Sequence, residues 1–271
     1  MTLTFAELDE IRERVSRKGW LNLIHHPEDG KLVDRIVSCS SVLNPEQRTL
    51  FGKLIDAYLY IPEVRQDIYD LWTKIRATCD LYQRVYLAPL KKRAEKRTKS
   101  GDHICYVLSS LFPQHDQKFR FLGTPFSDEI INLPEHCIVL VDDFVGTGET
   151  LEECYEQFSL KHPGMTAVVA TIVAQEQGIT AAARIGVEIL TNHRRSRTIS
   201  DGIAIAGEPA ENLRIYSSIE GSVGVAHEYR LGYGASEATV TISRTPDNTL
   251  PIFWTNANQE EFKWSAPFPR R

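Results

Sequence analysis

Residues 137–150 decide the fold of this chain, and they read Cys137-Ile-Val-Leu-Val-Asp-Asp-Phe-Val-Gly-Thr-Gly-Glu-Thr150. The apolar run from Ile138 to Val141 is continuous rather than alternating, which is typical of a parallel strand that is buried on both faces. Two acids follow the strand, then a short loop of glycine and threonine, then the start of a helix. The stretch therefore predicts a strand–loop–helix unit of an α/β fold.

The loop after this strand has the composition of a cup for a sugar phosphate. Asp142 and Asp143 are expected at the carboxyl end of the strand, where open α/β sheets place their ligands. Gly146 and Gly148 allow the backbone to bend and to approach a ligand closely. A helix that begins near Glu149 turns its free N–H groups and the positive end of its dipole toward the loop, which suits a phosphate.

Residues 141–150 resemble the phosphoribosyl-pyrophosphate (PRPP) motif of the type I phosphoribosyltransferases. The resemblance implies that Asp142 and Asp143 hold the ribose hydroxyls and are the catalytic acids. It also implies a ribose-phosphate loop that consists of these two acids with Val145, Gly146, Thr147, Gly148, Glu149 and Thr150. Mg²⁺ is implied as the cofactor, held through the ligand near the two acids and not directly by protein side chains.

Other motifs share parts of this pattern. A strand that ends in two acids can be a Walker B element, but the chain has no G-x-x-x-x-G-K-[ST]. Gly146-x-Gly148 lacks the third glycine of a dinucleotide-binding fingerprint, and that fingerprint has no acids before its loop. A tight strand-to-helix turn that binds no ligand stays open as the plainest alternative.

A basic stretch lies between an earlier strand and its helix. Val85–Pro89 predicts a short strand, and Ser100 and Asp102 can cap the helix that follows. Six of the nine residues from 91 to 99 are basic: Lys91, Lys92, Arg93, Lys96, Arg97 and Lys99. Because such cations form charge-assisted hydrogen bonds with dense anions, and because the resembling family binds pyrophosphate in this place, we expect these six residues to bind pyrophosphate. A solvated loop or a contact with nucleic-acid backbone stays open.

Strands that alternate with helices predict an α/β fold with a parallel-sheet, type I phosphoribosyltransferase-like core. We expect three parts: a helical N-terminal extension over 1–80, the core over 81–195, and an extra mixed segment over 196–271. The last segment is expected to complete the fold or to cover the site.

Apolar residues at helical spacing predict helices in the extension. One is expected over Phe5–Val15, one around Phe51 and Leu54, and one from Val64 to Ile75. Asn44, Pro45 and Gln47 supply an N-cap, a first-turn proline and a capping-box partner for the second of these helices.

Two pieces of the C-terminal segment carry a second resemblance. Leu231-Gly-Tyr-Gly234 and Thr245-Pro-Asp-Asn-Thr-Leu-Pro-Ile-Phe-Trp254 are similar to a phosphoribosyltransferase-like effector family of bacterial conflict and antiphage systems, some of them retrons. This implies a role in defence and other subunits of a defence system as partners. Tyr233, Phe253 and Trp254 are candidates to stack on a base, and burial in a core is the alternative for each.

Composition excludes some classes of protein. The net charge of −5 disfavours nonspecific binding of nucleic acid by the whole molecule, so direct nucleic-acid binding is not indicated, although it stays open. No apolar run approaches membrane-spanning length, and the N-terminus lacks the pattern of a signal peptide. The five cysteines include no C-x-x-C pair, which argues against a zinc site or a disulfide framework. We therefore expect a cytoplasmic protein without a membrane partner.

These features predict a phosphoribosyltransferase-like protein that binds PRPP or a nucleotide and acts on the C1′ bond of a ribose phosphate, as a glycosyltransferase or a nucleotide-degrading enzyme. Gly146 stands where the 6-oxopurine enzymes carry an acid, so a hypoxanthine or guanine reaction is not expected. Only residues 113–136 are available for a lid, and a short lid lets water replace the base as acceptor. The alternative is a non-catalytic subunit of a defence or regulatory complex that senses PRPP or a nucleotide, or that binds a partner.

Overall fold

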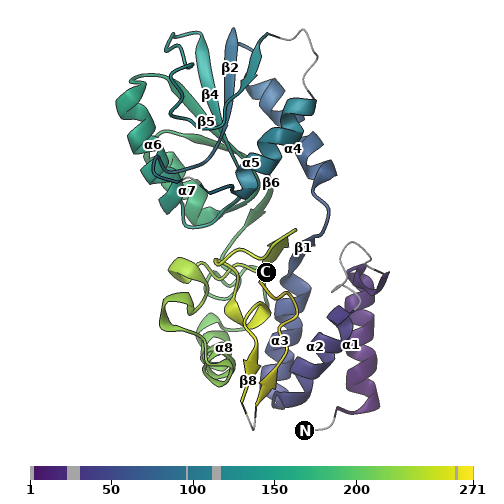
Figure 1. Cartoon of the computed structure of the whole chain (residues 1–271). Helices are drawn as coiled ribbons and strands as arrows, with labels where there is room; N and C mark the ends of the chain where they lie inside the picture. Colours follow the sequence, from purple (N-terminus) through teal and green to yellow (C-terminus); the bar gives the residue numbers. More distant parts are fainter. Residues whose placement is uncertain (1–2, 23–30, 96, 112–116, 260–261, 271) are drawn as a thin grey trace. The chain divides into compact units, whose positions relative to one another are not determined.

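The chain divides into two compact units (Figure 1). The structure is a computed structural model that describes residues 3–22, 31–95, 97–111, 117–259 and 262–270. Unit 1 comprises residues 1–63 and 196–271, and unit 2 comprises residues 64–195. Each unit has its own core, so each is described by itself.

Unit 2 is built on a five-stranded parallel sheet with the strand order β3-β2-β4-β5-β6. The strands are β2 (Arg84–Pro89), β3 (Phe119–Phe121), β4 (His136–Val145), β5 (Thr166–Gln175) and β6 (Glu188–Arg195). The run from Cys137 to Val141 in β4 is completely buried, as its continuous apolar character predicts. The predicted α/β class with a parallel-sheet core is confirmed.

Helices cover both faces of this sheet. They are α4 (Arg65–Thr78), α5 (Ser100–Ser110), α6 (Glu149–Lys161) and α7 (Glu176–Arg184). Figure 1 shows α4 and α5 on one face and α6 and α7 on the other. From β2 the chain crosses through α5 to β3 at one edge, whereas from β4 it crosses through α6 toward the other edge. The winding therefore reverses between β2 and β4, and parallel sheets bind their ligands beyond the carboxyl ends of the strands at such a point.

The division of the chain differs from the predicted boundaries in the segment from 64 to 80. The sequence places it in the N-terminal extension, whereas α4 packs on β5 and β6 of the sheet. Its apolar residues Ile68, Leu71 and Ile75 are buried there, and Lys74 donates a hydrogen bond to the carbonyl oxygen of Thr191 at 2.6 Å. Helical periodicity shows that one face of α4 is buried, but it does not show which element buries it.

Unit 1 joins the two ends of the chain. Its longer helices are α1 (Phe5–Arg17), α2 (Leu32–Val42), α3 (Pro45–Ala57) and α8 (Pro209–Val223). Its strands are β1 (Leu59–Ile61), which pairs in parallel with β7 (Val240–Ile242), and β8 (Ala257–Asn258), which pairs antiparallel with β9 (Lys263–Trp264). Short 3₁₀ turns are η1 (Trp20–Asn22), η3 (His227–Tyr229), η4 (Tyr233–Ala235) and η5 (Pro251–Phe253). Residues 1–63 and 196–271 therefore fold together.

Aromatic side chains from both ends of the chain make the core of unit 1. The rings of Tyr58 and Phe268 stack with their centroids 4.4 Å apart, and Trp264 donates its indole N–H to the carbonyl of Ile252 at 2.7 Å. Phe253 is completely buried in this core, so it is a core residue and is not placed to stack on a base. Trp254 is half-buried, whereas Tyr233 is 41% exposed.

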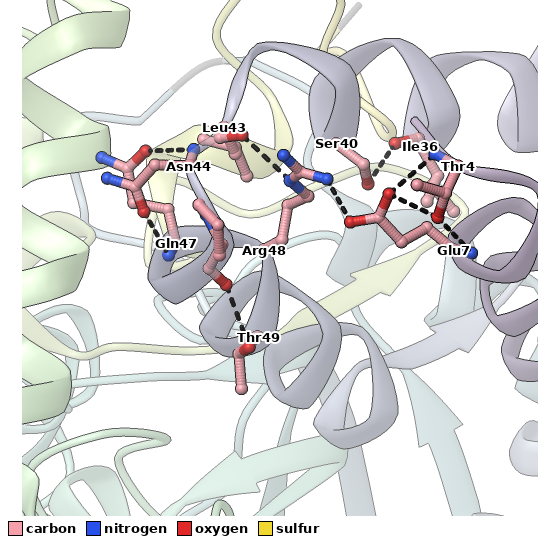
Figure 2. A network of polar contacts seen from close by, with 10 residues as sticks. Thr4, Glu7, Ile36, Ser40, Leu43, Asn44, Gln47, Arg48 and Thr49 are labelled. Atoms are coloured by element: carbon pink, nitrogen blue, oxygen red, sulfur yellow. Dashed lines mark hydrogen bonds and ion pairs between the residues drawn. The ribbon is translucent and has the colours of Figure 1, made fainter. Parts of the chain in front are cut away.

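The predicted capping box of the second N-terminal helix is confirmed. Asn44 Oδ1 accepts the N–H of Gln47 at 2.9 Å, and Gln47 Oε1 accepts the N–H of Asn44 at 3.0 Å, so two N–H groups at the start of α3 are satisfied. Figure 2 shows this cap beside Arg48, which donates to the carboxylate of Glu7 in α1 and, at 3.0 Å, to the carbonyl of Leu43. Arg48 thus ties α1 to the start of α3.

All five cysteines lie in the described part of the chain, buried and as free thiols. Among the helices that the structure describes, none combines the length and the apolar character needed to cross a membrane.

Candidate functional site

The acidic pair lies in the last part of β4, beside the point where the winding of the sheet reverses. Both Asp142 and Asp143 are half-buried. The N–H of Asp143 donates to Asp142 Oδ1 at 2.9 Å. Within the described residues, no lysine, arginine or histidine forms an ion pair with either carboxylate. Among the described residues, the two acids therefore form no salt bridge that stabilises the fold.

Burial and proximity disfavour the charged forms of this pair. Burial raises the pKa of Asp142 well above the usual value of an aspartate, and the neighbouring charge of Asp143 raises it further. Burial also raises the pKa of Asp143, while a hydrogen bond from Ser100 works in the opposite direction because it favours the ionised form. Hydroxyl donors or a cation from a ligand would relieve this cost.

The start of α5 is pressed against the end of β4. A Cβ atom on Gly101 would lie 2.4 Å from the carbonyl oxygen of Val141, so only glycine permits this approach. The same carbonyl accepts the N–H of Leu90 at 2.8 Å, which holds the first residues of the basic loop beside β4. The acidic and basic motifs, which are about fifty residues apart in the sequence, thus meet at the ends of adjacent parallel strands.

The loop of residues 146–148 is seated on α7. Gly148 has a φ of +91°, a left-handed conformation that glycine adopts at little cost, and it is the residue from which α6 starts. A Cβ atom on Gly178 of α7 would lie 2.6 Å from the carbonyl oxygen of Gly146, and one on Gly148 would lie 2.5 Å from Cβ of Ala181. Two glycines therefore let the loop and the helix touch backbone to backbone.

The first turn of α6 offers donors to a ligand. No side chain caps this helix, and the first N–H groups of an α-helix find no carbonyl acceptor in the helix itself. Thr147 and Thr150 are half-buried, and none of the described residues hydrogen-bonds to either hydroxyl. Uncapped N–H groups, the helix dipole and two hydroxyls suit an anion of phosphate size. Binding of the ribose phosphate by residues 145–150 stays a prediction.

Lys91 takes a different place from the other basic residues of the loop. Its side chain is buried, and its ammonium group lies 2.5 Å from the carboxylate of Asp102. The same carboxylate accepts the N–H of Lys99 at 2.6 Å. Asp102 therefore links the two ends of the basic loop, through an ion pair with Lys91 and a hydrogen bond from the backbone of Lys99.

Of the other cations that the structure describes in this loop, Arg93 and Arg97 are exposed, whereas Lys92 and Lys99 are half-buried beside acidic residues. Lys92 pairs with Glu153 of α6, and Lys99 lies 2.9 Å from Glu95. The side chain of Arg97 is 92% exposed, and Arg93 is exposed too. A surface cavity of about 650 Å³ is lined by Lys92, Arg93, Ala94, Glu95, Arg97, Glu153 and Gln157. Lys96 lies outside the described residues. Pyrophosphate binding by this loop stays a prediction.

Removing the buried cation is expected to loosen the basic loop. Lys91→Met keeps the length of the side chain but leaves Asp102 without its ion partner, so we expect the free energy of unfolding to fall by about 1–2 kcal/mol. Lys92→Met is the matched control, since it breaks an exposed pair that is worth about 0.5 kcal/mol or less. Urea unfolding of the two variants tests this. Equal effects would mean that the Lys91–Asp102 pair holds nothing in place.

The acidic pair also fits the predicted magnesium ion. Among the described residues there is no group of three or more His, Cys, Asp or Glu side chains that could hold a metal by itself. No such group is needed for an ion held through the ligand, because Mg²⁺ usually keeps water and substrate phosphates as ligands, and the half-buried carboxylates place negative charge beside it. The acidic pair therefore suits a Mg²⁺ ion that binds together with the ligand.

Sequence reasoning missed two contributors to this site. Ser100 is predicted as a helix cap, yet its hydroxyl contacts both acids. Gly178 is the third residue of α7, and its only signal in the sequence is that glycine is unfavourable within a helix unless close packing requires it.

Several solved structures are similar to this chain, all at low sequence identity. No curated protein matches the chain. Similar solved structures include the xanthine-guanine-hypoxanthine phosphoribosyltransferase of Helicobacter pylori, at 12% identity over 51% of this chain and 85% of that chain, with a TM-score of 0.32. The orotate phosphoribosyltransferase of Aeropyrum pernix is 15% identical over 59% and 75%, with a TM-score of 0.32. The AQ2163 protein of Aquifex aeolicus is 15% identical over 69% and 95%, with a TM-score of 0.34.

A family model provides the assignment. The model described as PRTase-CE matches residues 47–270, a range that includes all of unit 2 and much of unit 1. Because this match spans far more than half of the sequence, the chain belongs to the PRTase-CE family.

Proposed function

We propose that the chain binds PRPP or a ribonucleotide where β2 and β4 end, and that it acts on the bond at C1′ of the ribose. The observation that carries this proposal is the half-buried pair Asp142 and Asp143, which has no cationic partner among the described residues and is followed by the uncapped start of α6. Hydroxyl-binding acids next to a phosphate-binding helix end are the two halves of a ribose 5-phosphate site.

The acids would work by position and charge. Their carboxylates accept hydrogen bonds from the ribose hydroxyls and fix the sugar ring. Negative charge beside the ring stabilises the positive charge that develops near C1′ when its bond to the leaving group breaks. Mg²⁺, when bound, would neutralise part of the charge of the pyrophosphate. The hydroxyls of Thr147 and Thr150 and the first N–H groups of α6 would hold the 5′-phosphate.

The outward-facing cations of the basic loop would hold pyrophosphate. Arg93 and Arg97 are exposed, and guanidinium groups match phosphate oxygens in a two-pronged geometry. Lys91 would support the loop from inside through Asp102 and would not touch the ligand. This divides the six predicted cations into one supporting residue and a set of binding residues.

We also propose a role in antiphage defence, together with other subunits of a defence system. Its support is the resemblance of residues 231–234 and 245–254 to effectors of bacterial conflict systems. The test is phage plating on cells that carry the whole system with either the wild-type chain or a variant with asparagine at both acids. Equal protection by the two would contradict a defence role for this site.

Calorimetry with PRPP and Mg²⁺, followed by chromatography of the mixture, tests the biochemical proposal. We expect a dissociation constant between about 1 µM and 1 mM, the usual range of enzyme substrates. Release of pyrophosphate in the presence of a base, or of water alone, would identify a transferase or a hydrolase. Binding without turnover of any base or nucleotide would instead favour a sensor. Absence of binding to PRPP and to nucleotides would contradict the proposal.

A further inference from the structure

One hydroxyl group contacts both acids of the pair. Ser100 Oγ lies 2.6 Å from Asp143 Oδ1 and 3.0 Å from Asp142 Oδ1. Ser100 is the first residue of α5 and lies outside the acidic motif, so the sequence gives no reason to expect this contact. Nothing in the proposed function above uses it.

A serine hydroxyl has a single proton to donate. The shorter contact, with Asp143, has the length of a charge-assisted O–H···O bond, whereas the contact with Asp142 is longer. One donor therefore serves two acceptors that are side by side. The adjacent hydroxyls of a ribose would bring two donors to the same two carboxylates.

We propose that the Ser100 hydroxyl stands in for a ribose hydroxyl while the site holds no ligand, and that the ribose diol must displace it. This inference rests on the proposed function and adds a competitor that belongs to the chain itself. Ser100 would thus set the affinity for sugars: only a ligand with two adjacent hydroxyls replaces the serine and gains a further hydrogen bond.

The backbone around Ser100 is held, so the competitor cannot withdraw with its helix. Gly101 is packed against the Val141 carbonyl, where even a methyl group would lie at 2.4 Å. On the other side, the N–H of Lys99 donates to Asp102 at 2.6 Å, which closes the start of α5. Only the Ser100 side chain is left to move, by rotation to another staggered position of χ1.

The experiment compares the wild type with Ser100→Ala by calorimetry, with ribose 5-phosphate and 2-deoxyribose 5-phosphate as the probes. A net hydrogen bond contributes about 0.5–1.5 kcal/mol, which corresponds to roughly a threefold to tenfold change in affinity. We expect Ser100→Ala to bind ribose 5-phosphate about threefold to tenfold more tightly than the wild type. The deoxy sugar should gain less, since it lacks one of the two hydroxyls that would replace the serine.

Two further variants control the experiment. Ser100→Thr keeps the hydroxyl and should bind like the wild type. Ser110→Ala removes an exposed hydroxyl at the other end of α5, which donates to the carbonyl of Val107, and should also leave binding unchanged. A midpoint of thermal unfolding for each variant shows that it is folded.

The outcomes separate this inference from the proposed function. If the wild type binds ribose 5-phosphate and Ser100→Ala binds it equally or more weakly, the competitor role is wrong and the proposed function stands. If neither protein binds ribose 5-phosphate, PRPP or a nucleotide, the proposed function fails and the role of Ser100 falls with it. If both proteins bind PRPP but Ser100→Ala gains no affinity for it, the competitor role alone is wrong.

Discussion

Replacing Asp142 and Asp143 together by asparagine is expected to weaken PRPP binding by about a hundredfold or more and at the same time to stabilise the protein. The loss of binding follows because two hydrogen bonds to charged acceptors, worth about 1.5–3 kcal/mol each, are removed. Asparagine keeps the size of the side chain and an oxygen for the bond from the N–H of residue 143, so the backbone of β4 has no reason to change. Calorimetry with PRPP and Mg²⁺ measures the loss.

The gain in stability depends on pH, and its sign follows from the raised pKa of both acids. A carboxyl whose pKa is higher in the folded chain than in the unfolded chain holds its proton longer when it is folded. As the pH rises above about 4, the unfolded chain releases its protons first, and the wild type loses stability relative to the variant. We expect the variant to be more stable by about 1–2 kcal/mol at pH 8 and equally stable below about pH 4.

Urea unfolding at pH 4, 6 and 8 tests this difference. Asp9→Asn, at an exposed position of α1, is the control, because surface substitutions usually change stability by less than about 0.5 kcal/mol. If the double variant binds PRPP with the affinity of the wild type, Asp142 and Asp143 are not part of the binding site. If the double variant is no more stable than the wild type at pH 8, burial of the two charged carboxylates does not destabilise the fold.

Gly178→Ala is expected to destabilise the chain, although alanine is the better helix former. Alanine in a helix interior usually stabilises by about 0.5–1 kcal/mol relative to glycine, which is an upper bound for Gly178 in the first turn of α7. At this position its Cβ would lie 2.6 Å from the carbonyl oxygen of Gly146 and 2.7 Å from a methyl carbon of Val145. Overpacking of this kind costs about 1–3 kcal/mol, so we expect a net loss of about 1–2 kcal/mol.

The same substitution should also weaken ligand binding, because the carbonyl that it displaces belongs to the loop of residues 146–148. We expect PRPP affinity to fall about tenfold, as for the loss of one or two hydrogen bonds to phosphate. Gly221→Ala in α8 is the matched control: this glycine is exposed, and a Cβ there would meet nothing within 4 Å. It should stabilise by about 0.5–1 kcal/mol and leave binding unchanged. Effects of the same sign in both variants would show that the loop does not rest on Gly178.

Local patterns predicted several elements of both units well. The buried strand 138–141, the capping box at Asn44 and the helix that starts at Glu149 are all found where expected. Each depends on neighbours a few residues away: a continuous apolar run, a side chain that reaches the third N–H, or a glycine before a helix. The acidic and basic motifs could be predicted in the same way, because the order strand, loop, helix places both loops at the carboxyl ends of the parallel strands.

The sequence by itself thus determined the α/β class, the alternation of strands and helices along the core and the residues that follow two of its strands. Only the tertiary structure decided that α4 packs on the sheet, that β1 pairs with β7 across most of the chain, that Lys91 is buried against Asp102, and that Ser100 contacts the acidic pair. The physical reason is that periodicity records whether a side chain is buried, whereas the identity of its partner depends on contacts between segments far apart in the sequence.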